Sequence, residues 1–311
     1  MTASRRVRAF APGSIGNVGP GLDIFGCAVT GPGDTVIAEL RAQPGIQVTS
    51  AGHPDLPTDP ARNTAAIAAA EVLRRAGETT RGIRLAVEKG LPLAAGQGGS
   101  AASAVAGAVA ANTLLDSPLD QPQVMEACLV AESTVAGHHA DNIAPALLGG
   151  WVLVRALDPL DVVKLPVPRS LRIVLAHPDQ RLRTADARAV LPRMVPLALA
   201  LHQAAQVAAM AAALAVGDLA LLGRALDDRI AEPARAPLVP GFREGKAAAL
   251  EAGALGGSLS GSGPTSFALA DGDAAAARVA AAMRQAYEKL GISCTVRVER
   301  VDDRGAWVGA G

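Results

Sequence analysis

Three glycines stand within four positions in the stretch Gly96-Gln-Gly-Gly-Ser100. Glycine accepts backbone angles that other residues avoid, and it lets a backbone approach a ligand closely. Where such a loop opens a helix, several backbone N–H groups point at one spot, with the positive end of the helix dipole behind them. This arrangement binds an anion, most often a phosphate, although a glycine turn without a ligand has the same composition. Neither G-x-x-x-x-G-K-[ST] nor a complete G-x-G-x-x-G is present.

A second group of polar side chains lies in the eleven residues from Glu132 to Asn142, which also contain His138, His139 and Asp141. Two adjacent histidines on regular structure cannot both face one ion, and the sequence has no H-E-x-x-H pattern. A hard-cation site fits better, with a carboxylate and phosphate oxygens holding Mg²⁺. A polar turn between a helix and a strand is the alternative.

The loop expected from Ala11 to Gly26 has five glycines and two prolines and carries Asn17 and Asp23. Loops on a rigid scaffold concentrate binding groups. The other interpretation is a structural turn in which both side chains bond to their own backbone.

Three arginines, Arg181, Arg183 and Arg188, flank Thr184, which can cap a short helix after an expected strand. Arginines at a strand end and a helix start suit a carboxylate or a phosphate. They also suit an ordinary polar helix face, and the residues alone leave both open.

Composition excludes several classes of protein. The 311 residues include 29 Lys+Arg and 29 Asp+Glu, and half are hydrophobic, which suits one large or two ordinary domains. Zero net charge argues against a general nucleic-acid or membrane-surface binder, and 2% aromatic residues argue against base-stacking platforms. Cys27, Cys128 and Cys294 are scattered, which predicts free thiols in the cytoplasm.

The longest apolar run is Val195 to Val216, interrupted by His202, Gln203 and Gln206. Much of it is alanine, which contributes little to membrane insertion. We expect a buried or dimer-facing helix here and no membrane span. No signal-peptide core follows the arginines near Met1.

Strands and helices must position these groups, and their order indicates an α+β protein. A helix from Asn63 or Thr64 should stop at Gly77, because Asn and Thr cap helix starts and Gly ends helices. Proline-rich residues 156–170 look like a boundary, and 231–241 like a loop carrying Arg235. The other expected strands are 7–10, 26–30, 34–40, 46–49, 82–88, 150–155, 172–176, 293–301 and 306–308, and the other helices lie near 99–115, 122–135, 195–230, 242–252 and 273–291.

Three glycine-rich motifs stand in a fixed order: Ala11 to Asp23, Pro92 to Ala102, and Gly256 to Leu269. Together they resemble the three motifs of the GHMP kinase superfamily. Asn17-Val-Gly-Pro-Gly-Leu-Asp23 and His139-Ala-Asp-Asn-Ile-Ala-Pro-Ala-Leu-Leu-Gly-Gly150 are similar to homoserine kinases in particular, as is Glu232-Pro-Ala-Arg235. The resemblance covers essentially the whole chain.

The resemblance implies a two-domain GHMP kinase fold. Residues 1–160 would form an ATP-binding domain similar to the second domain of ribosomal protein S5, and residues 161–311 a ferredoxin-like domain completing the substrate site. It implies transfer of the ATP γ-phosphoryl group to the side-chain hydroxyl of L-homoserine, giving O-phospho-L-homoserine for threonine biosynthesis. A homodimer through the C-terminal half would also be in keeping with it.

Site residues follow from the same resemblance. Ser100 and Glu132 match Mg²⁺ ligands, and Thr184 matches a threonine near the transferred phosphoryl. Beyond the resemblance, we hypothesise that the transferring phosphate itself accepts the hydroxyl proton, with Asp141 and Asn142 orienting the reacting groups. Positions that hold homoserine match Asn17, Asp23, His139, Arg188 and Arg235. The ATP phosphates would be cradled by Pro92, Leu93, Ala94, Ala95, Gly96, Gln97, Gly98, Gly99, Ser100, Ala101 and Ala102.

This chain departs from the family pattern in two places. Most relatives read G-L-G-S-S-A, so Gln97 replaces an apolar residue and Gly99 replaces a serine. The segment before His139 is also one residue shorter than in most relatives. Both His138 and His139 are therefore candidates for the histidine position of the family motif. Two alternatives stay open: a kinase for another small hydroxylated acid or a sugar, and a catalytically silent regulatory homologue.

Overall fold

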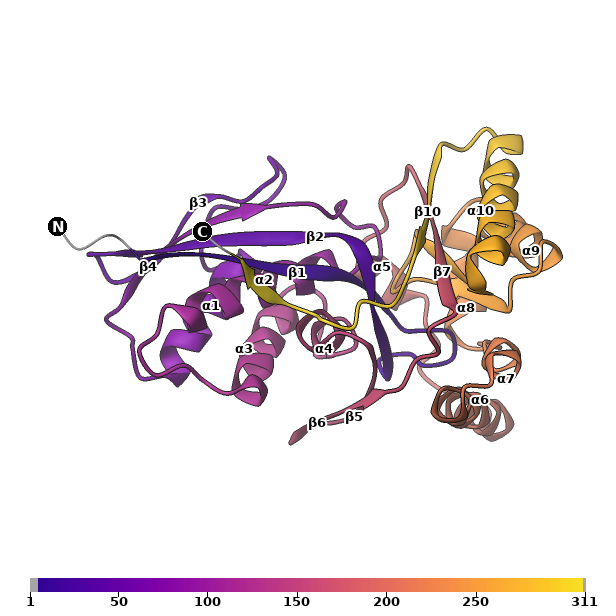
Figure 1. Ribbon diagram of the computed structural model, residues 1–311, viewed down its shortest axis with the longest axis horizontal. Coiled ribbons are helices and arrows are strands. Elements are labelled where there is room, and N and C mark those ends of the chain that lie inside the picture. The colour runs from indigo at the N-terminus through magenta and orange to yellow at the C-terminus, as the bar shows by residue number, and fades with distance from the viewer. Residues whose placement is uncertain (1–4, 310–311) are drawn as a thin grey trace.

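The computed structural model describes residues 5–309 and has two lobes side by side along its long axis (Figure 1). The first lobe is built on a seven-stranded sheet in which β11, β1, β2, β4 and β3 are neighbours in that order and the β5–β6 hairpin joins through β2. Its strands are β1 (Arg6–Gly16), β2 (Phe25–Arg41), β3 (Gly45–Ser50), β4 (Gly82–Glu88), β5 (Trp151–Leu157), β6 (Leu160–Leu165) and β11 (Trp307–Gly309).

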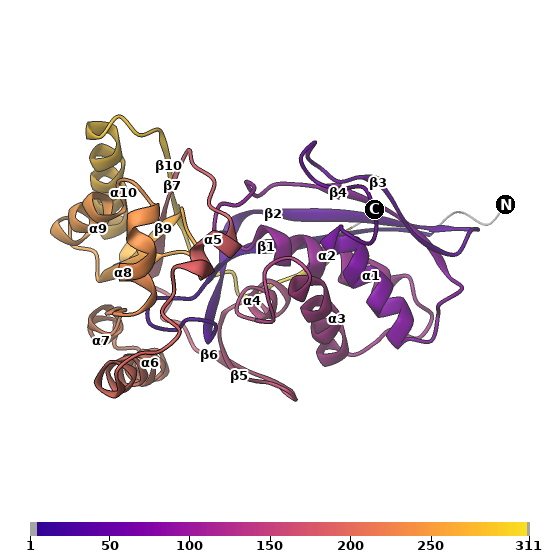
Figure 2. The same cartoon turned by 180° about the vertical axis from the view of Figure 1, so that it is seen from behind.

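Four helices lie together on one side of this sheet (Figures 1 and 2). They are α1 (Thr64–Arg75), α2 (Gly99–Thr113), α3 (Gln121–Ser133) and α4 (Ile143–Leu148). α2 lies at the centre, and ten of its residues are buried. Its small side chains allow close packing: a Cβ on Gly107 would lie 2.4 Å from the carbonyl oxygen of Ala65 on α1. The alanine-rich sequence therefore reflects a tightly enclosed helix.

The second lobe has a four-stranded antiparallel sheet in the order β10-β7-β9-β8. Side chains alternate between its faces, as in any strand. Ile173 and Leu175 pack in the cluster with Met210 of α6, whereas Val174 packs with Tyr287 of α10. The elements are β7 (Leu171–Pro178), α5 (Thr184–Ala189), α6 (Leu197–Val216), α7 (Leu219–Arg224), α8 (Ala231–Arg235), η1 (Ala236–Leu238), α9 (Phe242–Glu251), β8 (Gly256–Leu259), β9 (Ser266–Asp271), α10 (Gly272–Lys289) and β10 (Cys294–Glu299).

The two lobes share hydrophobic packing. Phe25 and Trp151 of the first sheet belong to the same buried cluster as Leu171 and Phe267 of the second. The final strand, β11, returns to pair with β1. The lobes are therefore joined by a continuous core as well as by the chain.

Caps and glycines predicted from sequence agree with the structure where the signal is local. Asn63 caps α1, accepting a hydrogen bond from the Ala66 N–H at 3.3 Å. Gly77 has a φ of 72° just beyond the helix. Both confirm the predicted ends of that helix.

Longer strands replace part of the expected first loop. That loop was expected from Ala11, but β1 continues to Gly16 because the chain stays paired with β2 across a bulge between Pro12 and Gly13. A bulge is where a strand tolerates proline. The expected strands 26–30 and 34–40 are one strand, β2.

The expected boundary at residues 156–170 contains β6, which forms a hairpin with β5, and the second sheet begins with β7 at Leu171. Two further expectations were wrong in type. The expected loop at Arg235 contains α8, because the Asp228 carboxylate accepts hydrogen bonds from the N–H groups of residues 230–232 and stabilises the first turn. Thr184 is the first residue of α5 and does not cap it; the preceding Arg183 holds that position.

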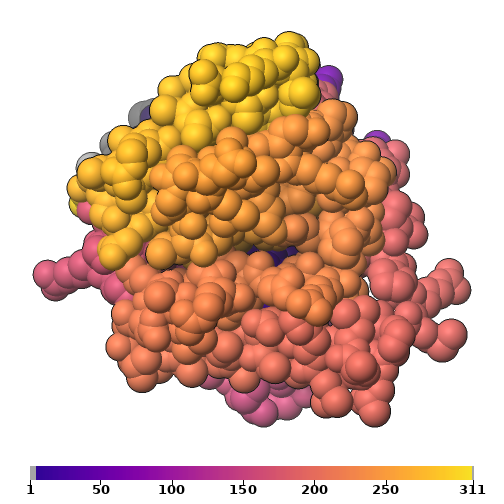
Figure 3. Space-filling view, turned by 90° about the vertical axis from the view of Figure 1, so that its right-hand side faces the viewer, coloured from indigo at the N-terminus to yellow at the C-terminus, as the bar shows by residue number. Residues whose placement is uncertain are grey.

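α6 is long and apolar enough to cross a membrane by length and composition alone. Only Met210, Ala213 and Leu214 along it are buried, so of the two expected forms the buried helix was wrong, and the dimer-facing helix stays a prediction. It lies on the outer side of the second lobe, in the lower part of the face seen in Figure 3. An apolar face of α6 is thus exposed on the surface of this chain.

Candidate active site

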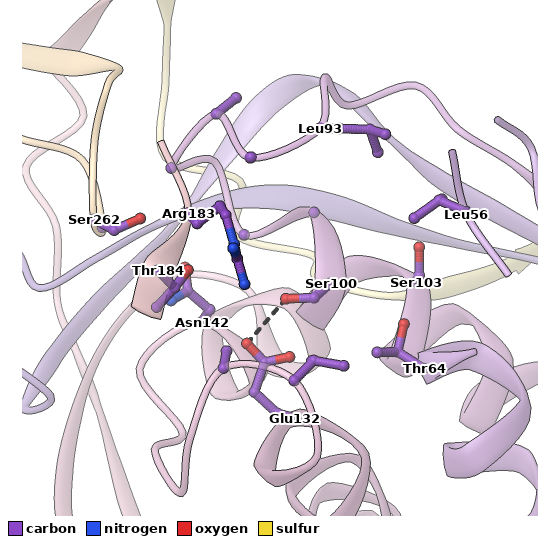
Figure 4. Close-up of a pocket in the computed structure, with 18 of the residues that line it drawn as sticks. Leu56, Thr64, Leu93, Ser100, Ser103, Glu132, Asn142, Arg183, Thr184 and Ser262 are labelled. Atoms are coloured by element: carbon purple, nitrogen blue, oxygen red, sulfur yellow. Dashed lines mark hydrogen bonds between the residues drawn. The ribbon is translucent and has the colours of Figure 1, made fainter. Parts of the chain in front are cut away.

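A cavity of about 750 Å³ lies between the lobes, lined from both of them (Figure 4). The glycine-rich loop after β4 and helix α3 border it on one side, and α5 and the Gly261–Ser262 turn on the other. Predicted site residues that line it are Asn17, Pro92, Leu93, Ala94, Ala95, Gly96, Gly98, Gly99, Ser100, Glu132, His139, Asn142, Thr184, Arg188 and Arg235. Those that do not are Asp23, Gln97, Ala101, Ala102 and Asp141.

The phosphate loop, residues 92–102, connects β4 to α2. Gly98 occupies the N-cap position with a left-handed φ of 67°, and no side chain caps the helix. A Cβ on Gly98 would lie 2.1 Å from Ser14 Oγ, and one on Gly96 would lie 2.3 Å from the Ser260 carbonyl oxygen. Glycine is required at both positions. Gly99 and Ser100, the first residues of α2, line the cavity, and no side chain caps this helix, as an anion site needs.

Gly99, one of the two unusual positions, tolerates a side chain. A Cβ there would meet Lys89 Nζ at 3.4 Å, an ordinary contact. Lys89 also donates to the Gly99 carbonyl oxygen at 3.0 Å and forms an ion pair with the fully buried Asp34. The loop is thus supported from beneath by a buried lysine.

Glu132 and Ser100 meet at the start of α2. Glu132 Oε1 accepts a hydrogen bond from Ser100 Oγ at 3.0 Å (Figure 4). Its Oε2 is buried and has no hydrogen-bond partner among the described residues. Burial raises the pKa of Glu132 to about 7; Asp141 adds to the rise, while His139 and Ser100 oppose it. A buried carboxylate oxygen without a partner, beside a hydroxyl, fits a hard cation such as Mg²⁺.

His139, and not His138, belongs to the site. His138 is exposed, whereas His139 is 5% exposed and lines the cavity. Its Nδ1 lies 3.0 Å from Asp141 Oδ1. The other carboxylate oxygen of Asp141 accepts from the Asn17 N–H at 2.8 Å. Asp141 is fully buried and holds both neighbours in place.

Asn17 has features of both interpretations of its loop, the binding loop and the structural turn. It lines the cavity, and its Oδ1 accepts from the Asp23 N–H at 2.8 Å. Both residues have positive φ, 53° and 58°, which Asn and Asp adopt more readily than other side chains.

Asp23 and Arg188 are bonded to each other. Arg188 donates two hydrogen bonds to the Asp23 carboxylate, at 2.5 and 3.1 Å. Arg188 Nε is buried without a hydrogen-bond partner in the described part of the chain. The buried Arg235 donates to the carbonyl oxygens of Ala187 and Gly261, and burial together with the nearby Arg188 lowers its pKa. Two guanidinium groups and one carboxylate therefore converge from segments far apart in sequence.

The sequence did not identify Arg183 as a site residue, although Arg183 is one of the three arginines noted beside Thr184. It lines the cavity and points into it from the start of α5 (Figure 4). No hydrogen bond or ion pair joins its guanidinium to any of residues 5–309. Lys89 and Ser262 also line the cavity unpredicted; the position of Lys89 directly before the glycine-rich loop was the available signal.

Protein-family models match residues 63–150 as the GHMP kinases N terminal domain and residues 210–289 as the GHMP kinases C terminal domain. A homoserine kinase of Chlorobium phaeobacteroides (strain BS1) is 42% identical, covering 92% of this chain and 93% of that protein. One of Arabidopsis thaliana is also 42% identical, covering 96% and 84%.

Among solved structures, homoserine kinase from Cytophaga hutchinsonii superposes with a TM-score of 0.94 at 41% identity, covering 99% of this chain and 98% of that one. Sequence similarity extends over more than 90% of this chain, and the similarity of fold extends over 99% of it. The chain belongs to the homoserine kinase family of the GHMP kinases.

Proposed function

We propose that this enzyme transfers the γ-phosphoryl group of ATP to the side-chain hydroxyl of L-homoserine, giving O-phospho-L-homoserine. The observation that carries the proposal is the cavity itself. It joins the uncapped start of α2 to Arg188 and Arg235. One end thus suits a triphosphate and the other a small amino acid. The names of the relatives, at about 42% identity, support the same substrate.

The substrate would be recognised by its two charges. Arg235 offers its guanidinium to the carboxylate. Asp23 offers negative charge to the ammonium, and Arg188, already bonded to Asp23, bridges the two. Asn17, His139 and Thr184 would orient the remainder of the molecule.

Mg²⁺ would be held by Ser100 and Glu132, whose free Oε2 fits a cation. When bound, the ion neutralises phosphate charge. Arg183 has no hydrogen-bond or ion-pair partner among residues 5–309 and would add positive charge on the opposite side of the cavity. Phosphoryl transfer depends mainly on such positioning and charge neutralisation.

The proton would leave with the phosphoryl group. The substrate oxygen bonds to the γ-phosphorus, the bond from that phosphorus to the β-phosphate bridging oxygen breaks, and ADP departs. Asp141 is engaged by His139 and Asn17, so it serves to orient rather than to accept. The hydroxyl proton passes to an oxygen of the transferring phosphate, with Asn142 helping to orient the reacting groups.

Residues 1–160 would bind ATP and residues 161–311 complete the substrate site. We place the reaction in the cytoplasm, supported by three free cysteines. The exposed apolar side chains of α6, with Leu197 75% and Leu201 61% exposed, support a homodimer through this half. Light scattering after size-exclusion chromatography tests the dimer, and a monomeric mass would refute it.

A substrate screen tests the function. We expect ADP release with L-homoserine, and a new phosphomonoester resonance in ³¹P NMR. Comparable turnover on mevalonate or galactose would favour another hydroxylated substrate. Binding of ATP without turnover on any of them would favour a silent homologue.

A further inference from the structure

The side chain of Gln97 turns away from the cavity, although it stands in the middle of the phosphate loop. It is 4% exposed. Its backbone carbonyl oxygen accepts from the Ser14 N–H of β1 at 3.1 Å. The side chain instead enters the contact between the lobes. The Gln97 side chain therefore does not line the cavity, and a role for it must act through the loop.

Both ends of the Gln97 amide are bonded to the second lobe. Oε1 accepts from Arg297 Nη2 of β10 at 2.8 Å. Nε2 donates to Thr265 Oγ1 at 3.1 Å. Thr265 Oγ1 in turn lies 3.1 Å from His177 Nδ1 on β7. Four side chains thus form one chain of hydrogen bonds across the interface.

The direction of these bonds is fixed by Arg297, which can only donate. The Gln97 oxygen must therefore face Arg297, and its NH₂ must face Thr265. The Thr265 hydroxyl, having accepted from Gln97, has its own proton for the Nδ1 atom of a neutral His177. Burial lowers the pKa of His177, which agrees with a neutral ring.

Arg297 depends on this partner. It also forms an ion pair with Glu299 at 3.4 Å, and Glu299 accepts from Thr30 of the first lobe. Arg297 Nη1, the atom of that ion pair, has no hydrogen bond within the described chain. An apolar residue at position 97 would therefore remove the hydrogen bond that this guanidinium makes through Nη2.

The neighbouring loop residues are bonded to the same lobe through their backbone. The Thr265 N–H donates to the Ala95 carbonyl oxygen at 3.2 Å, and Ser260 Oγ donates to that of Gly96 at 2.6 Å. Gln97 adds two hydrogen bonds from its own side chain to these contacts between the loop and the second lobe. Because Gly96 and Gly98 on either side have positive φ, small shifts at Gln97 would redirect the N–H groups that follow.

We propose that Gln97 is a positioning residue that fixes the phosphate loop against the second lobe, and that Gln97 and Arg297 form a matched pair. The inference rests on the proposed binding of ATP phosphates by this loop. It predicts that substitution of either residue weakens the binding of ATP and leaves the binding of homoserine unchanged.

The test compares Gln97→Leu, Arg297→Met and the double variant with the full-length wild-type enzyme. We expect each single variant to raise the KM for ATP by about tenfold, the effect of losing a hydrogen bond to a charged group. The KM for L-homoserine should stay within about twofold of wild type. The double variant should have a KM for ATP no higher than that of the more impaired single variant, because the two side chains act on one interaction.

Asn112→Leu is the matched control. Asn112 is an amide at the far end of α2, bonded to the backbone of Leu119, so its loss should lower the Tm and leave the KM for ATP unchanged. The inference would be overturned if the increases in the KM for ATP of the two single variants multiplied in the double variant. It would also be overturned by a folded Gln97→Leu enzyme with an unchanged KM for ATP. If Gln97→Leu does not fold, Arg297→Met decides alone by the same criterion. A wild-type enzyme that does not bind ATP would instead refute the proposed function.

Discussion

Both ring nitrogens of His139 face hydrogen-bond acceptors: Nδ1 lies 3.0 Å from Asp141 Oδ1, and Nε2 lies 3.1 Å from the carbonyl oxygen of Ala136. Since neither acceptor can donate, both nitrogens carry protons and the ring is an imidazolium. Burial opposes this charge, but the hydrogen bond and charge of Asp141, with Glu132 and Asp23, raise the pKa of His139 to about 9.

This raised pKa predicts how stability changes with pH. The group binds its proton more tightly in the folded than in the unfolded chain, so its contribution is full below about 6.5 and is lost as pH rises through about 9. We expect the Tm difference between wild type and His139→Gln to be largest near pH 6 and to shrink as the pH rises through about 9. Calorimetry across this range measures it, and a difference independent of pH would contradict a charged His139.

Glu132→Gln should remove the cation site while keeping the shape of the side chain. We expect kcat to fall by roughly 10²-fold or more, because a ligand of a charge-neutralising ion is lost. Mg²⁺ with ADP should raise the Tm of the wild type at pH 8 and leave that of the variant nearly unchanged. An equal Mg²⁺-dependent rise in both proteins would exclude Glu132 as a ligand.

Asp141→Asn separates orientation from proton removal. We expect kcat to fall by less than about 10²-fold, because the phosphate, and not Asp141, takes the proton. A loss of about 10⁴-fold, at the upper end of general-base effects, would identify Asp141 as the base. Steady-state kinetics at saturating substrates give the answer.

Arg183→Gln tests the unpaired cation of the cavity. We expect kcat to fall by about 10²-fold with little change in the KM for L-homoserine, as when one charge-stabilising donor is removed. Arg181→Gln is the control, because Arg181 is exposed and paired with Asp55, and such surface pairs contribute little. Equal kinetics for the two variants would show that Arg183 has no part in transfer.

Local sequence signals predicted much of the backbone geometry of the glycine-rich loop that lines the cavity. The glycines at 96 and 98 are needed for backbone angles and close contacts, which composition alone indicates. The cap at Asn63 depends on an atom three residues away. Such features are determined within a few residues, so a pattern in the sequence is enough to find them.

Long-range pairings were not predictable in this way. Asp23 and Arg188 are 165 residues apart, and Gln97 and Arg297 are 200 apart; nothing local indicates either bond. Gln97 could be identified as unusual, but not as turned out of the cavity. α6 has the composition of a core helix, and only its position on the outer side of the second lobe shows that most of it is uncovered.

The return of β11 to β1 makes the second lobe an insertion in the path of the chain. Residues enter it after β6 and leave it after β10, and Val301 bridges to Val29 before the last strand joins the first sheet. Two connections, instead of one, link the lobes at this side. A hinge about a single linker is thereby ruled out for the described chain, so access to the cavity depends on local loop movement or on bending of both connections together.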